Sequence, residues 1–332
     1  MEKIVLPANE IPSFRTGKAI ERGVEKRLLF TTWGGIGDQI CAEPTLRFAL
    51  DSFKDCEVFL ETETPELYQH LKFAKVYDTK KVKPIRENFL VFETIPDPDR
   101  LSFEFVAHNV THCVDFPCIS ALRAMPPISY KAVILKPEIS EEKQQWLTQY
   151  TDSKYVAIHA GKHWQSKTFP VEYWNTVLDA LIAEGFTPVL FGKETDETQG
   201  TVATKTEGCV DLREKTTLSE SIWLLQRMKS MVTNDSSPMH MAATGNAAIA
   251  FIASAKHQDY LYHWRQGIED QKKQSPQWAW KMKHFNKSGI WDIISNCPNQ
   301  KDTVLIDKVD SEILKSWLPE PKEMIAWIKA QL

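Results

Sequence analysis

Residues 231–245 read MVTNDSSPMHMAATG: an apolar run, then short polar side chains, then an apolar pattern at helical spacing. This order predicts a strand, a turn and a helix, and the turn consists of Asn234, Asp235, Ser236 and Ser237. Short polar side chains cap helices, and the N–H groups at a helix start bind anions such as a pyrophosphate. A capped helix that binds nothing explains the same polar residues. A capped helix alone does not explain why His240 lies one turn after the start of the predicted helix.

The rest of the chain alternates between strand-like and helix-like patterns. Predicted strands lie at residues 27–33, 56–61, 89–93, 154–159, 187–192, 230–233 and 247–253. Predicted helices lie at residues 44–53, 65–73, 170–184, 218–229 and 238–243. Strands that alternate with helices form parallel sheets, which bind ligands at the carboxyl ends of their strands. We therefore expect an α/β fold with two Rossmann-like, doubly wound parallel-sheet domains that face each other across a cleft.

A polar stretch at residues 136–153 separates the two halves of this pattern. We place the N-terminal domain at residues 1–145 and the C-terminal domain at residues 146–318. The last segment, residues 319–332, has the pattern of a short helix that packs back onto the body.

The composition is that of an ordinary globular protein. The chain has 332 residues, of which 42% are hydrophobic, and a net charge of −4, which argues against a protein that is basic all over. Its six cysteines are scattered through a chain too large to need disulfides, which indicates a reducing compartment. The chain shows no long apolar run and no signal peptide. We expect a cytoplasmic monomer without a transmembrane segment, and peripheral contact with a membrane stays open.

A glycine-rich loop, GGIGD at residues 34–38, follows the first predicted strand. Gly34, Gly35 and Gly37 let the backbone turn tightly and approach an acceptor or a phosphate closely. The loop is neither GxGxxG nor a P-loop, so a nicotinamide cofactor is not indicated. Asp38 can act as a general base on an acceptor hydroxyl, and it can equally be a helix-start residue.

A second loop, HAGKHWQSKTFP at residues 159–170, follows the first strand of the second half. Lys162 and Lys167 supply positive charge before a helix that begins at a proline, which suits a diphosphate. A solvated loop is the alternative.

Four segments in this order resemble the heptosyltransferases of glycosyltransferase family 9, which extend the lipopolysaccharide core: GGIGDQICAEPTLRFAL, HAGKHWQSKTFPVEYW, FGKETDE and DLREKTTLSESIWLLQRMKSMVTNDSSPMHMAATG. The resemblance implies a GT-B fold in which the N-terminal half binds the acceptor and the C-terminal half binds a nucleotide diphosphate sugar. It also implies an inverting transfer without a metal or a cofactor, onto lipopolysaccharide or another surface glycan. The lean towards an ADP-sugar, with heptose as a candidate sugar, rests on this resemblance alone.

The resemblance also assigns roles to individual residues. Asp38 matches the base that takes the proton of the acceptor hydroxyl. Donor binding falls to six positions: Lys167, Glu194, Asp235, Ser236, Ser237 and His240. Ser237 stands where the family usually has glycine, which keeps a catalytically silent nucleotide-sugar-binding protein as an alternative.

Residues 256–287 show no motif that we can match to the family, and they hold seven Lys or Arg interleaved with aromatic residues. Such a composition suits DNA, so a phage-type enzyme that glycosylates a hydroxylated base is a second alternative, although packing of the insertion onto the body explains it too. Metal sites are not indicated: His108, His112, Cys113 and Cys118 lack a zinc spacing, and Asp97-Pro98-Asp99 reads as a turn.

Overall fold

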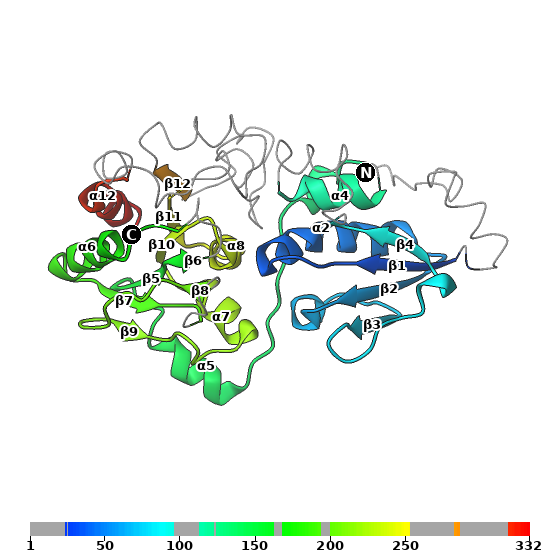
Figure 1. The fold of residues 1–332 in the computed structure, drawn as a ribbon, viewed down its shortest axis with the longest axis horizontal. Coiled ribbons are helices and arrows are strands. Elements are labelled where there is room, and N and C mark those ends of the chain that lie inside the picture. Colours follow the sequence, from blue (N-terminus) through cyan, green and yellow to red (C-terminus); the bar gives the residue numbers. More distant parts are fainter. Residues whose placement is uncertain are drawn as a thin grey trace. The chain divides into compact units, whose positions relative to one another are not determined.

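The computed structural model describes residues 24, 26–95, 113–122, 124–162, 168–193, 200–252, 282–285 and 318–332. The chain divides into two units, Met1–Lys136 and Pro137–Leu332. Each unit contains a parallel β-sheet with helices (Figure 1), as the alternating pattern predicts. Among the described residues, no helix is both long enough and apolar enough to cross a bilayer.

The first unit has a four-stranded parallel sheet in the order β3-β2-β1-β4. Its strands are β1 (Arg27–Thr31), β2 (Glu57–Thr62), β3 (Lys75–Asp78) and β4 (Leu90–Glu93). The helix α2 (Ile36–Ser52) connects β1 to β2, and α4 (Asp115–Leu122) packs beside α2 (Figure 1). On the other face of the sheet, a small cluster contains Leu29, Phe59 and Phe89, which are buried in it.

Two elements of the first unit differ from the sequence prediction. The helix predicted at residues 44–53 begins at Ile36, so Pro44 lies inside it rather than at its start. The predicted helix at residues 65–73 is a single 3-10 turn, η2 (Pro65–Tyr68). It stops there because Tyr68 is fully buried and its hydroxyl donates to the Gln39 carbonyl oxygen at 2.6 Å, which fixes the turn against α2. The chain can then enter β3, an edge strand that the sequence did not predict.

The second unit has a six-stranded parallel sheet in the order β12-β11-β10-β5-β7-β9. Its strands are β5 (Tyr155–His159), β7 (Thr187–Leu190), β9 (Val210–Asp211), β10 (Ser230–Asn234), β11 (Ala248–Ile252) and β12 (Met282–Phe285). Two short strands, β6 (Gly161–Lys162) and β8 (Gly200–Thr201), form a separate antiparallel pair. The central strands β10 and β11 are buried along their whole length, as expected for a sheet covered on both faces.

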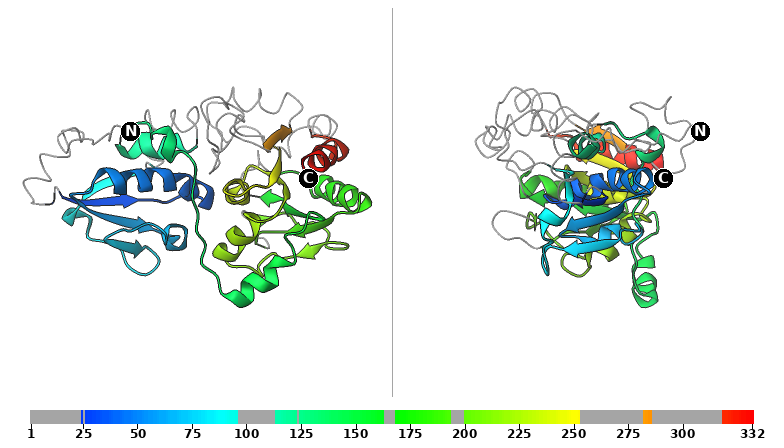
Figure 2. Two further views of the ribbon diagram at one scale, coloured as in Figure 1. Left: turned by 180° about the vertical axis from the view of Figure 1, so that it is seen from behind. Right: turned by 90° about the vertical axis from the view of Figure 1, so that its right-hand side faces the viewer.

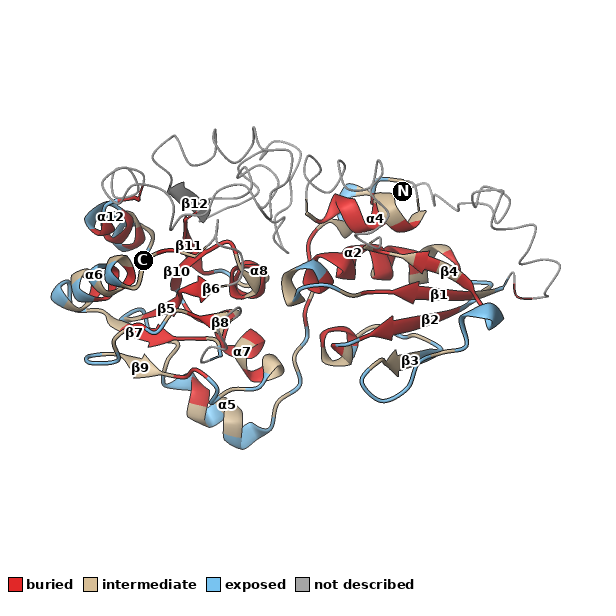
Figure 3. Ribbon diagram, in the orientation of Figure 1, coloured by how far each residue is buried: buried red, intermediate tan, exposed pale blue. Residues whose placement is uncertain are grey.

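Helices lie on both faces of this second sheet (Figure 2). One face packs against α6 (Val171–Ala183) and α12 (Pro321–Gln331), around the fully buried Trp174. The other face carries α7 (Leu218–Leu225) and α8 (Ser237–Ala243). A further helix, α5 (Glu141–Thr148), opens the unit and contacts α7. The burial pattern in Figure 3 matches this arrangement, because the central strands β5, β7, β10 and β11 are mainly red, whereas α6 and α12 also carry tan and pale blue residues.

Helix α7 ends four residues earlier than the sequence predicts. Its start is fixed by a reciprocal cap: the Thr217 N–H donates to the Glu220 carboxylate at 2.8 Å, and the Glu220 N–H donates to the Thr217 hydroxyl at 3.2 Å. After Leu225 the chain turns directly into β10.

Candidate functional site

Two strand ends meet at the carboxyl edge of the second sheet. In β10, Thr233 lies opposite His159, the last residue of β5. The next residue, Asn234, is buried and makes two hydrogen bonds to Gly161: its Oδ1 accepts from the Gly161 N–H at 3.0 Å, and its Nδ2 donates to the Gly161 carbonyl at 2.9 Å. The amide side chain therefore extends the pairing of the two strands beyond the sheet.

His159 is a buried titratable group at this edge. Its Nδ1 lies 2.9 Å from the Ser236 hydroxyl oxygen. Burial lowers the pKa of His159 to about 4, so the imidazole is neutral at neutral pH. A neutral ring can exchange a hydrogen bond with a hydroxyl without placing a charge inside the unit.

Ser236 is the N-cap residue of α8, yet its side chain makes no capping bond to the helix. Its hydroxyl instead lies 3.2 Å from the Thr233 hydroxyl and donates to the Asn234 carbonyl at 3.2 Å. The strand ends thus hold the Ser236 side chain, with His159 as its nearest partner. The Ser236 hydroxyl is fixed by the sheet rather than by the helix that it precedes.

Two glycines allow this edge to pack closely. A Cβ at Gly161 would lie 2.8 Å from both Asn234 Oδ1 and the Cε1 of His159. At Gly192, where φ is +119°, a Cβ would lie 2.4 Å from Thr201 and 3.2 Å from the His159 ring. Any side chain at these positions would displace the hydrogen-bonded network.

The structure places the predicted donor residues as follows. Asp235 and His240 are buried, and Ser237 is the first residue of α8. Lys162, which the sequence assigns to an acceptor or phosphate loop, is half-buried in β6, and β6 follows β5 after one residue. Lys167 and Glu194 lie outside the described residues, as does most of the 256–287 insertion.

Sequence analysis did not single out His159, Gly161 or Asn234 as the centre of this edge. One signal was present, because a histidine that ends a buried apolar strand, YVAIH, must either have a partner or lose its charge. The partner itself is 77 residues away in sequence, and only the sheet order brings the two together.

In the first unit, the glycine-rich loop leads into α2. Gly34 has a φ of +90°, a conformation that other residues rarely adopt, and Gly35 is the N-cap. Gly37 lies in the first turn of the helix, next to Asp38. The Asp38 side chain is exposed, and its Oδ2 accepts from the Gly35 N–H at 3.1 Å. Asp38 thus takes the helix-start role that the sequence left open, and its side chain is exposed to solvent.

The start of α2 is held in place by a buried amide. Gln39 donates from Nε2 to the Gly34 carbonyl at 3.2 Å. Its Oε1 accepts from the hydroxyls of Thr62 and Thr64 at 3.0 and 2.7 Å. This network ties the glycine-rich loop to the carboxyl end of β2, so the position of Asp38 follows from the sheet.

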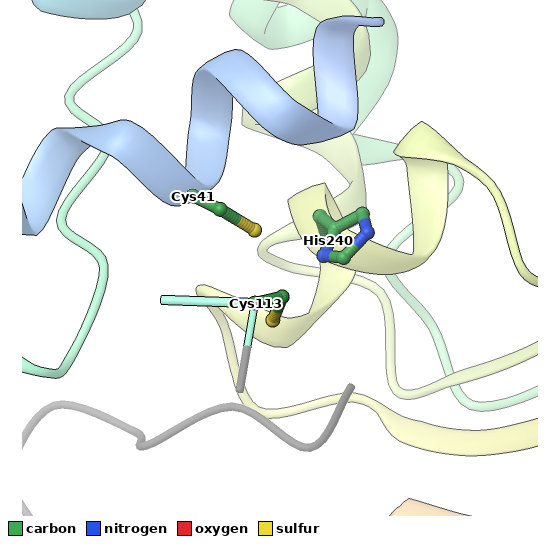
Figure 4. Close-up of side chains that lie close together, drawn as sticks. All are labelled: Cys41, Cys113 and His240. Carbon is green, nitrogen blue, oxygen red and sulfur yellow. The ribbon is translucent and has the colours of Figure 1, made fainter. Parts of the chain in front are cut away.

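Two cysteines of the first unit lie close together. The sulfur atoms of Cys41, on α2, and Cys113, just before α4, are within 4.8 Å of each other, and both side chains are drawn in Figure 4. Cys118, which the sequence grouped with Cys113, is buried in α4, and burial raises its pKa to about 12. His108 and His112, like Asp97 and Asp99, lie outside the described residues. His240, also labelled in Figure 4, belongs to α8.

Comparison with known proteins relates the chain to a family. Residues 124–266 match the family described as glycosyltransferase family 9 (heptosyltransferase). This match covers less than half of the chain, and the curated relatives align with it over shorter segments. Its most similar curated relatives include lipooligosaccharide heptosyltransferase 2 of Haemophilus influenzae, 34% identical over 24% of this chain and 25% of that protein. Lipopolysaccharide heptosyltransferase 2 of Escherichia coli is 32% identical over 29% of each chain. The alignments thus span between a quarter and a third of the relatives' length.

Solved structures share the fold over nearly the whole chain. The structure of Escherichia coli ADP-heptose LPS heptosyltransferase II has a TM-score of 0.54 and 16% identity, and covers 92% of this chain and 99% of that chain. The iron-containing, dodecameric heptosyltransferase TibC in complex with ADP-D-β-D-heptose has a TM-score of 0.59 and 15% identity, over 92% of this chain and 76% of that chain. The two parallel-sheet units are therefore those of the GT-B heptosyltransferase fold.

Proposed function

We propose that the protein is an inverting glycosyltransferase that moves a sugar from a nucleotide diphosphate to a hydroxyl acceptor. The family match, which covers much of the second unit, supports the sugar-nucleotide part of this proposal. The main support for the proposal is the sheet edge formed by His159, Asn234 and Ser236. Buried polar groups there fix the Ser236 hydroxyl. This serine lies in the loop that the resemblance assigns to the donor diphosphate.

In the proposed reaction, the acceptor oxygen forms a bond to the anomeric carbon while the bond from that carbon to the diphosphate breaks. Asp38 takes the acceptor proton, because its exposed carboxylate can be reached from solvent. The nucleoside diphosphate leaves with the electron pair, and the residues assigned to the donor loop stabilise its charge.

The donor we propose is an ADP-sugar, with heptose as the leading candidate, because the TibC structure contains ADP-D-β-D-heptose. The acceptor we propose is a lipopolysaccharide or another surface glycan. We further propose that the transfer requires no metal. Since TibC contains iron, this point needs its own test: metal analysis of the purified protein, and transfer with and without a chelator.

The first experiment is a thermal-shift and calorimetric screen of ADP, UDP, GDP and CDP against the wild-type protein. A nucleotide that binds only the folded state raises the melting temperature by mass action. We expect ADP to give the largest shift. If none of the four binds and no sugar is hydrolysed or transferred, the proposed function is wrong.

The role of Asp38 is tested with Asp38→Asn. The amide oxygen of asparagine can still accept from the Gly35 N–H, so the helix start is preserved while the basic group is removed. We expect ADP binding to stay unchanged and transfer to fall by about 10²–10⁴-fold. Transfer at the wild-type rate would exclude Asp38 as the base, and loss of ADP binding as well would point to misfolding.

A further inference from the structure

The loop at residues 79–88 joins β3 to β4 and presents aliphatic side chains to solvent. Val82 is 52% exposed and Ile85 is 68% exposed. Five large hydrophobic residues are exposed in the described part of the chain, and these two lie three positions apart. In Figure 3 the segment that follows β3 has the pale blue colour of exposed residues. Two exposed aliphatic side chains on one loop form a small apolar tip.

The same loop is strongly basic. It contains four exposed cations, Lys80, Lys81, Lys83 and Arg86, against the single carboxylate of Glu87. Within residues 79–88, four positive charges and one negative charge give a balance of +3, in a chain whose net charge is −4. Lys81 pairs with Asp78 at 3.1 Å and Arg86 pairs with Glu61 at 2.8 Å. The positive charge that the loop offers to a partner therefore lies mainly on Lys80 and Lys83.

The loop is held in shape at both ends. The Asp78 side chain accepts from the Lys80 N–H at 3.1 Å, and the Asp78 carbonyl accepts from the Val82 N–H at 2.9 Å. At the other end, Arg86 forms an ion pair with Glu61 at 2.8 Å, and Phe89 is buried against Phe59. The exposure of Val82 and Ile85 is thus imposed by the surrounding contacts.

We propose that the 79–88 loop is a docking surface for an anionic lipid bilayer. Val82 and Ile85 enter the boundary of the acyl chains, and the lysines contact the headgroup phosphates. A nucleic-acid surface fits less well, because bases stack on aromatic side chains and the uncharged residues of this tip are aliphatic. The inference does not depend on the proposed transferase activity.

The 79–88 loop begins at the same edge of the first sheet as the loop that precedes Asp38. Thr79 donates to the Thr62 carbonyl at 3.0 Å, so the loop leaves the sheet at the carboxyl end of β2. The glycine-rich loop before Asp38 is tied to the same end of β2 through Gln39. Contact at residues 79–83 therefore brings a bilayer to the edge of the first unit that carries Asp38, which suits an acceptor anchored in lipid.

The test is co-sedimentation of the full chain with phosphatidylcholine vesicles, with and without phosphatidylglycerol. We expect binding only to the vesicles that contain phosphatidylglycerol, and weaker binding as salt is added. The double variant Lys80→Gln/Lys83→Gln should lower the partition coefficient on the order of 30-fold, at roughly fivefold for each lysine. Val82→Ser/Ile85→Ser should lower it about tenfold.

The matched control is Lys54→Gln/Lys72→Gln, which removes two exposed lysines of the same unit outside the loop. It should leave binding within about twofold of wild type, because short-range headgroup contacts are lost only at the docking surface. Circular dichroism verifies that each variant is folded. The inference would be overturned if phosphatidylglycerol did not increase vesicle binding of the wild-type protein, or if the loop variants bound vesicles as well as the control variant does. So would loop variants that lose retention of duplex DNA at low salt while keeping vesicle binding. Nucleotide binding is measured on the same samples, so failure of the proposed function is detected separately.

Discussion

Acidification should destabilise the second unit through His159. Burial lowers the pKa of His159 from 6.5 to about 4. Below pH 6.5 the unfolded chain therefore binds a proton that the folded protein does not accept until the pH approaches 4. The stabilising contribution is complete above pH 6.5 and is lost progressively as the pH falls towards 4. One pKa unit corresponds to about 1.4 kcal/mol, so the whole loss is about 3 kcal/mol.

The perturbation that isolates this residue is His159→Asn. The amide of asparagine can occupy roughly the place of Nδ1 and keep a hydrogen bond to the Ser236 hydroxyl, but it does not titrate. Other groups titrate equally in both proteins, so the difference between wild type and variant reports on His159 alone.

The assay is urea unfolding followed by tryptophan fluorescence at several pH values. Of the 11 tryptophans only Trp33 lies before residue 137, so the signal comes mainly from the second unit. Between about pH 7 and about pH 4, wild type should lose about 3 kcal/mol more unfolding free energy than His159→Asn. A difference below about 1 kcal/mol, or a ring that titrates near its ordinary pKa by NMR, would refute the reasoning.

Substitutions at three further positions test the packing of the two units. Gly161→Ala places a methyl group 2.8 Å from two buried neighbours, and should cost about 1–3 kcal/mol in urea unfolding; an unchanged midpoint would contradict the close packing of the edge. Glu43 is fully buried and pairs with Arg47 at 2.8 Å, so Glu43→Ala should cost about 3 kcal/mol by circular dichroism, and Glu43→Gln less; equal losses would show that the hydrogen bonds contribute little. Ile325→Ala removes a buried side chain of α12 and should cost about 2–5 kcal/mol, whereas stability like that of wild type would mean that this helix does not seal the core.

The sequence predicts the central strands well. The strands β1, β5, β10 and β11 begin and end within two residues of the predicted ranges. They are buried on both faces, and they therefore appear in the sequence as continuous apolar runs. The edge strand β3, with the sequence KVYD, gives no such signal, because only part of it is covered.

Helix boundaries are less predictable, because they depend on distant partners. Pro44 indicates a helix start, but the Asp38 carboxylate and the Gln39 network stabilise a start at Ile36. Pro44 lacks an N–H, so the Ile40 carbonyl loses its usual partner while the helix continues.

In the candidate site, too, some features are visible in the sequence and others depend on contacts between distant segments. The polar turn at residues 234–237 is visible in sequence as a strand-to-helix junction. The bond from His159 to Ser236 is not, because it needs β5 and β10 to be neighbours. Local sequence patterns predict where the loops of the site lie. The order of the strands in the sheet determines which side chains of those loops contact one another.

The C-terminal helix has a consequence for the order of folding during synthesis. Met324, Ile325 and Ile328 fill the core of the second unit against α6. Ribosomes release the chain from its N-terminus, so the described sheet and helices of the first unit have left the exit tunnel while these side chains are still being added. The first unit can therefore reach its packed state early. The apolar face that α12 covers stays open until residue 328 emerges, and exposed apolar surface makes a nascent chain prone to aggregation during this interval.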